Sequence, residues 1–118
     1  MSYDINLVNP DTGDTIELDE PHQERGGTYA MGDSTEAWLN ITYNYSPHFY
    51  HVFGDRGIRT IYGMTGENSK QVLKMAISML GDDVNEDYWA ATEGNAKKAL
   101  MGLLHFAVLA PDGVWEGD

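Results

Sequence analysis

The sequence predicts a single α+β domain over residues 1–118. We expect an N-terminal antiparallel β-sheet, made of a hairpin and a central strand at 36–45, packed by three C-terminal helices. Polar and apolar residues alternate in three early segments, 3–7, 15–18 and 36–45, whereas apolar residues at three- and four-residue spacing follow. Because the strands precede the helices instead of alternating with them, α+β fits better than a wound parallel sheet. A chain of 118 residues can bury a core without disulfides or metals.

The strands are predicted by local alternation. Residues 3–7 and 15–18 alternate in polarity, and residues 9–14 between them are rich in turn formers, so we expect a hairpin with a longer loop. The strand at 36–45 shows the clearest alternation. Its predicted core face consists of Ala37, Leu39, Ile41, Tyr43 and Tyr45.

The helices are predicted by caps and apolar stripes. Ser46-Pro47 is typical of a helix start, and that helix is expected to end near Phe53. Thr65 is expected to cap a second helix that ends at Gly81, and a third is expected over residues 92–109. The predicted core stripe of this last helix is Ala96, Leu100, Leu103, Leu104, Ala107 and Val108. The tail after it either docks its one tryptophan or frays.

The charge is the most unusual global property. Nineteen acidic residues face seven basic ones, which gives a net charge of −12, and no base precedes Arg25. A surface of this sign repels nucleic acid and anionic membranes, so we expect direct binding to neither. It attracts a basic surface on a partner protein. The alternative is that the acids serve only hydration and solubility.

Composition also limits the compartment and the chemistry. The chain has no cysteine, which excludes disulfides, thiolate metal sites and cysteine nucleophiles. The first residues carry no basic and apolar leader, and the longest apolar stretch, 103–110, is too short to span a bilayer. We therefore expect a soluble cytoplasmic protein. The oligomeric state is not indicated.

Three motifs are interpreted as structural. Asp11-Thr12-Gly13 matches the aspartic-protease triplet, but its setting favours a turn. A calcium-loop pattern starts at Asp83 and fails at Tyr88, where glycine is needed, so its acids are expected near a helix N-terminus. His48 and His51 make only half a zinc site. We therefore predict no metal, no cofactor and no catalytic residue, and an enzyme is the less favoured class.

A small-molecule site is predicted in the first half of the chain. The face of the 36–45 strand opposite the core carries an indole and two amides but no charge. If the glycine-rich connection before it folds over this face, aromatic and amide groups surround one pocket, which is the usual composition of a ligand site. The candidate ligand-binding residues are His22, Arg25, Tyr29, Trp38, Asn40, Asn44 and Tyr50. The alternative is that Trp38 packs under a helix and the amides bind loop backbone.

Three sequence segments carry a resemblance. Residues 17–22, 25–30 and 36–45, with 92–96 further on, resemble small uncharacterised proteins of bacteria and phages. The resemblance implies a phage or mobile-element accessory protein, a class that often inhibits host defence. Acidic members often do so by occupying a nucleic-acid channel. The first functional hypothesis is therefore an inhibitor that engages a basic host protein surface, and the second is a protein that binds or sequesters a small molecule or nucleotide. An enzyme without a readable motif is the third.

Overall fold

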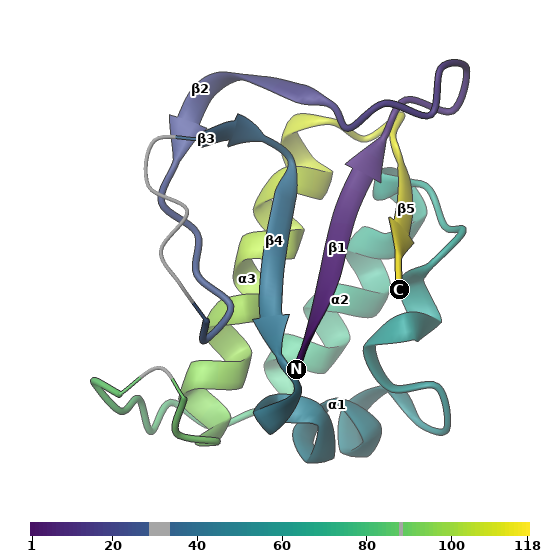
Figure 1. Ribbon diagram of the computed structural model, residues 1–118. Helices are drawn as coiled ribbons and strands as arrows, with labels where there is room; N and C mark the ends of the chain where they lie inside the picture. The colour runs from purple at the N-terminus through teal and green to yellow at the C-terminus, as the bar shows by residue number, and fades with distance from the viewer. Residues whose placement is uncertain (29–33, 88) are drawn as a thin grey trace.

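A three-stranded antiparallel sheet forms one layer of the molecule, and two long helices lie behind it (Figure 1). The structure is a computed structural model that describes residues 1–28, 34–87 and 89–118. The sheet has the order β4-β1-β5, with β1 (Ser2–Val8) in the centre, β4 (Trp38–Thr42) on one side and β5 (Val114–Gly117) on the other. The predicted α+β class, with N-terminal strands and three later helices, is confirmed.

Residues 15–18, the second half of the expected hairpin, do not continue along β1 as a paired strand. β2 (Glu17–His22) pairs with β3 (Ser34–Glu36) in a separate two-stranded sheet. Residues 15–16 stay joined to the end of β1 by a Val8–Thr15 bridge, by a hydrogen bond from the Ile16 amide to the Leu7 carbonyl at 2.9 Å and by one from Asn6 Nδ2 to Thr15 Oγ1 at 2.7 Å. The pairing goes no further because both edges of β1 are already paired, to β4 and β5. The alternation of residues 15–18 was a correct indication of a strand, but alternation does not specify the partner.

The predicted strand at 36–45 is divided into shorter elements. β4 ends at Thr42, whose hydroxyl accepts a hydrogen bond from the Asn44 amide and caps a 3₁₀ turn, η1 (Tyr43–Tyr45). β4 is the edge strand of its sheet, because β1 takes the central position. The side chains of the predicted core face nevertheless point inward, with Tyr43 partly buried.

The helices follow the predicted starts and stops closely. α1 (Ser46–Phe53) begins one residue before the expected position, and a 3₁₀ turn, η2 (Gly57–Ile61), follows it. α2 (Gly66–Ser78) and α3 (Glu93–Leu109) are capped by Thr65 and Thr92, whose hydroxyls accept the amide protons of Asn68 and Asn95. Each hydroxyl satisfies one of the amides that a helix leaves unpaired at its start.

The core lies between the sheet and the antiparallel pair α2–α3. The tail docks: Trp115 on β5 is fully buried, and its indole Nε1 donates a hydrogen bond to Ser69 Oγ on α2 at 2.7 Å. One expected core residue is wrong, because the Val108 side chain is 54% exposed. Phe106, two residues earlier, is fully buried instead, so the buried stripe of α3 is rotated slightly from the predicted one.

Both edges of the three-stranded sheet are covered by irregular backbone. On the β4 side, the Thr42 amide donates to the carbonyl of Gly26 at 2.7 Å, and Gly26 forms a parallel bridge with Ile41. On the β5 side, the backbone of Trp115 exchanges hydrogen bonds with Gly63 and Met64 at 2.9 and 3.0 Å. Covered edges do not invite strand addition, so binding surfaces must be sought elsewhere.

Candidate functional site

The predicted ligand-binding residues are placed in different parts of the fold. His22 is buried at the end of β2, where Nε2 donates to the Glu36 carbonyl at 2.7 Å and Nδ1 accepts the Glu24 amide proton at 3.2 Å. Its ring stands edge-on to Phe106 at 4.7 Å between centroids. Both ring nitrogens are therefore engaged in joining β2 to β3 and the core.

The two candidate amides also make hydrogen bonds inside the protein. Asn40 is buried on the face of β4 opposite the helices, and its Nδ2 donates to Asp4 Oδ1 at 2.7 Å. Asn44 Nδ2 donates to the carbonyl of Trp89 at 2.9 Å. Asn44 therefore bonds loop backbone, as the alternative interpretation expects, whereas Asn40 bonds a side chain of β1.

The other described candidates lie on different elements. Trp38 lies half-buried on β4, Tyr50 is exposed on α1, and Tyr29 falls outside the described residues. Arg25 lines a hollow of about 270 Å³ together with Lys98 and Met101 of α3, whereas His22 lines a different one. Ligand binding by the seven residues therefore stays a prediction.

Tyr45 forms one wall of the Arg25 hollow, and its environment has a measurable consequence. Burial, assisted by the negative charge of Asp87, raises the pKa of Tyr45 from 10.0 to about 12. The unfolded chain thus ionises this phenol first. We predict that the Tyr45 contribution to stability is intact below pH 10 and is lost as the pH rises through about 12. Tyr45→Phe should flatten this alkaline decline in urea unfolding, whereas Tyr50→Phe, on an exposed ring, should leave it unchanged.

The motifs interpreted as structural are accounted for by local contacts. Asp11-Thr12-Gly13 lies in a tight turn, where the Gly13 amide donates to the Asn9 carbonyl at 2.7 Å. Asp83 Oδ1 accepts the amide proton of Gly94 at 3.2 Å, in the first turn of α3, as expected for an acid near a helix N-terminus. Among the described residues, no three His, Asp or Glu side chains are arranged to hold a metal ion.

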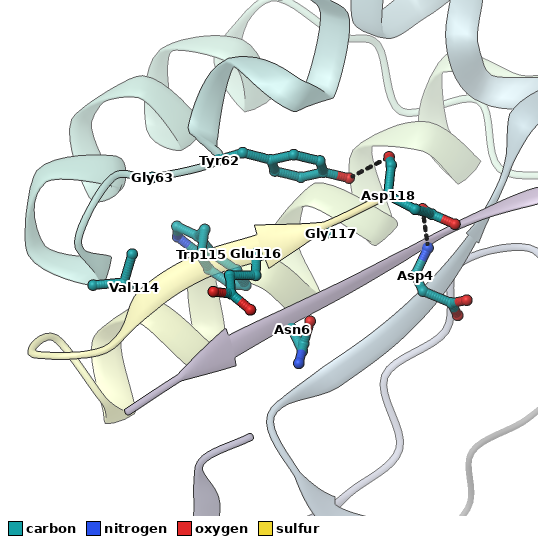
Figure 2. A pocket seen from close by; sticks show the side chains of 9 residues that line it. All are labelled: Asp4, Asn6, Tyr62, Gly63, Val114, Trp115, Glu116, Gly117 and Asp118. Carbon is teal, nitrogen blue, oxygen red and sulfur yellow. Dashed lines mark hydrogen bonds between the residues drawn. The ribbon is translucent and has the colours of Figure 1, made fainter. Parts of the chain in front are cut away.

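A shallow hollow lies along β5 (Figure 2). It measures about 720 Å³, and Figure 2 shows Tyr62 above β5, with Asp4 and Asp118 at one end and Glu116 on the strand. The Asp4 amide donates to Asp118 Oδ1 at 2.9 Å, and Arg59 Nε donates to the main-chain oxygen of Asp118 at 2.8 Å. Burial raises the pKa of Tyr62. These groups satisfy one another and fasten β5, so we assign this hollow a structural role.

Many of the acidic residues lie at two ends of the molecule, apart from Asp4, Glu116 and Asp118 along the β5 hollow. One end is formed by the 9–14 loop, the β2–β3 pair and the 110–113 turn, which lie together at the top of Figure 1. We call it the acidic end, and its exposed carboxylates belong to Asp11, Asp14, Glu17, Asp19, Glu20, Glu36 and Asp112. The segments that form it contain no lysine or arginine.

The other acidic group, in the loop between α2 and α3, is partly neutralised. Lys97 Nζ lies 2.7 Å from Asp82 Oδ1, and Lys98 follows on the same helix. The acidic end, by contrast, carries seven exposed carboxylates on segments without lysine or arginine, so we expect the stronger negative potential there.

An apolar groove runs through the acidic end. One hollow of about 350 Å³ lies between residues 16–22 and the end of α3, and a second of about 220 Å³ adjoins it. Both are lined by Ile16, Leu109 and Ala110. Leu109 and its neighbour Val108 are 55% and 54% exposed. Sequence reasoning missed this groove, because it treated residues 15–18 as half of a hairpin and did not place them against the end of α3.

Comparison with known protein families, curated proteins and solved structures finds no match for this chain. No helix in the described ranges is long and apolar enough to cross a membrane. The function is therefore argued from the acidic end itself.

Proposed function

We propose that the protein binds a basic surface of a partner protein through its acidic end and inhibits the partner by occupying that surface. The observation that supports this is the group of exposed carboxylates on the 9–14 loop, β2, β3 and the 110–113 turn, with no basic residue in those segments. Carboxylates held on strands and tight turns are in place before binding, which limits the ordering cost of association.

Charge of one sign at one end of a molecule favours oriented encounter. Such a surface steers a basic partner and raises its association rate at low salt. The same charge repels nucleic acid. A partner surface that normally holds nucleic acid has the required basic charge, so occupying it blocks the natural ligand. A bacterial defence nuclease, inhibited by a phage or mobile-element protein, fits this chemistry.

The test compares two sets of neutralised carboxylates that change net charge equally. The test set is Glu17→Gln, Asp19→Asn, Glu20→Gln and Glu36→Gln at the acidic end. The control set is Asp55→Asn, Glu67→Gln, Asp82→Asn and Glu86→Gln elsewhere, all exposed. Partners retained at low salt from a bacterial host are identified, purified and titrated against each variant by calorimetry at several salt concentrations.

We expect the test set to raise Kd by about tenfold or more and to reduce the salt dependence of Kd, since each of the four exposed carboxylates contributes a modest amount to the binding free energy. The control set should change Kd by about threefold or less, through long-range charge alone. Nuclease partners should lose nucleic acid when the protein binds. An equal loss of affinity in the test and control sets, or an affinity that does not change with salt concentration, would refute the proposal.

A further inference from the structure

We infer that the apolar groove between β2 and the end of α3 receives a basic segment of the partner in which lysine or arginine alternates with a large apolar residue. This inference rests on the proposed function and adds to it a site and a recognition chemistry. Two observations support the inference: the charge complementarity between the groove and a basic segment, and the exposed apolar floor of the groove.

The floor of the groove is apolar and accessible. Leu109 and Val108 end α3 with more than half of each side chain exposed, and Ile16 lines the groove beside Leu109. An isolated exposed leucine needs no explanation. Here Leu109 and Ala110 line the same hollow as the partly buried Ile16, so a guest side chain that enters the hollow removes apolar surface from water on several sides.

The rim of the groove is anionic along its whole length. Glu17, Asp19 and Glu20 of β2 line one side, and Asp112 lines the adjoining hollow. The end of α3 adds to this field, because a helix C-terminus carries partial negative charge and the last turn of α3 has no basic residue. His105 also lines the groove, and its Nδ1 lies 3.0 Å from Glu24 Oε1, so its positive charge when protonated is offset by that carboxylate.

An apolar floor under an anionic rim matches the anatomy of lysine and arginine. Their aliphatic stems pack on apolar surface while the charged heads reach outward to acids. A leucine-sized neighbour in the guest would fill the space next to Leu109. A segment with charge but no apolar residues would use only the rim, and an apolar segment without charge would use only the floor.

Two synthetic peptides of equal charge test this directly. One alternates lysine with leucine, and the other alternates lysine with serine. Each is titrated into ¹⁵N-labelled protein at low and at physiological salt, and Kd and the shifted amides are recorded. The key variant is Leu109→Gln, and the control is Met101→Gln on the same helix, since Met101 is 51% exposed and lies outside this groove.

We expect the lysine–leucine peptide to shift amides of residues 16–22 and 105–112 and to bind about fivefold more tightly than the lysine–serine peptide. Leu109→Gln should remove this advantage, and Met101→Gln should keep it. Equal affinity of the two peptides, or amide shifts centred elsewhere, would refute binding in the groove. If both peptides bind the acidic end with equal affinity, the groove is not the binding site, but the proposed function stands. If neutralising the acidic end leaves peptide binding unchanged, both the groove and the proposed function are refuted.

Discussion

Trp115→Ala should destabilise the protein by about 4 kcal/mol, close to the total stability of many domains of this size. Trp115 is fully buried, and it joins β5 on one side of the core to Ser69 of α2 on the other. Alanine leaves a cavity that the surrounding strands and helix can fill only in part. The substitution also removes the hydrogen bond that Ser69 Oγ accepts from the indole. Ser69 keeps the hydrogen bond that its hydroxyl donates to the Gly66 carbonyl at 2.8 Å.

Urea unfolding followed by far-UV circular dichroism measures this loss, because the helical signal does not depend on the removed indole. Trp115→Phe separates the two contributions: it keeps a ring in the core and should cost about 1–2 kcal/mol for the lost hydrogen bond and volume. Trp89→Ala is the matched control, since Trp89 is 52% exposed and should cost about 0.5 kcal/mol or less. A Trp115→Ala variant as stable as Trp89→Ala would show that the tail is not docked.

Local signals in the sequence predicted the elements well. Thr65 was recognisable as a cap because the capping hydroxyl, the amide that it binds and the following apolar stripe all lie within a few residues. The alternation of Tyr3, Ile5 and Leu7 likewise reported a strand with one buried face, and all three side chains are buried.

Pairing between distant segments could not be predicted in the same way. Leu7 of β1 faces Trp115, and Ile5 faces Leu39, although more than a hundred residues separate Leu7 from Trp115. Nothing near β1 distinguishes these partners from residues 15–18, which are closer in sequence and equally alternating. A hairpin has the smaller entropy cost of loop closure, but in the fold this edge of β1 pairs with β5, whose Trp115 is fully buried.

For the candidate site, too, local features were predictable from the sequence and contacts between distant segments were not. The absence of any base before Arg25 already indicated an acidic region, and the fold gathers much of it with Asp112 at one end. The uncharged face of β4 was interpreted as a ligand wall because residue types alone do not reveal that Asn40 binds Asp4 across the sheet. Exposure of Val108 and Leu109 depends on where α3 stops against β2, which is a tertiary fact.

Gly26→Ala should be the second most damaging single change, at about 3 kcal/mol. A Cβ at Gly26 would lie 2.2 Å from the Asn40 carbonyl oxygen and 2.7 Å from the Ile41 Cα, both main-chain atoms of β4. Main chain inside a paired strand cannot move aside as a flexible side-chain tip can, so the connection must separate from β4. The separation breaks the hydrogen bond from the Thr42 amide to the Gly26 carbonyl and exposes the edge of the sheet.

Gly81→Ala is the control for this substitution, because it adds the same methyl group where the nearest atom, Asp83 Oδ1, is 3.6 Å away. It should leave stability within about 0.5 kcal/mol or raise it slightly, since alanine restricts the unfolded chain. Amide exchange at Thr42 distinguishes the mechanism: Gly26→Ala should accelerate it far more than global unfolding requires. If Gly26→Ala and Gly81→Ala unfold at the same urea concentration, the close approach of this connection to β4 is wrong. Gly26 would then lie in a simple turn, and β4 would be an open edge available to a partner strand.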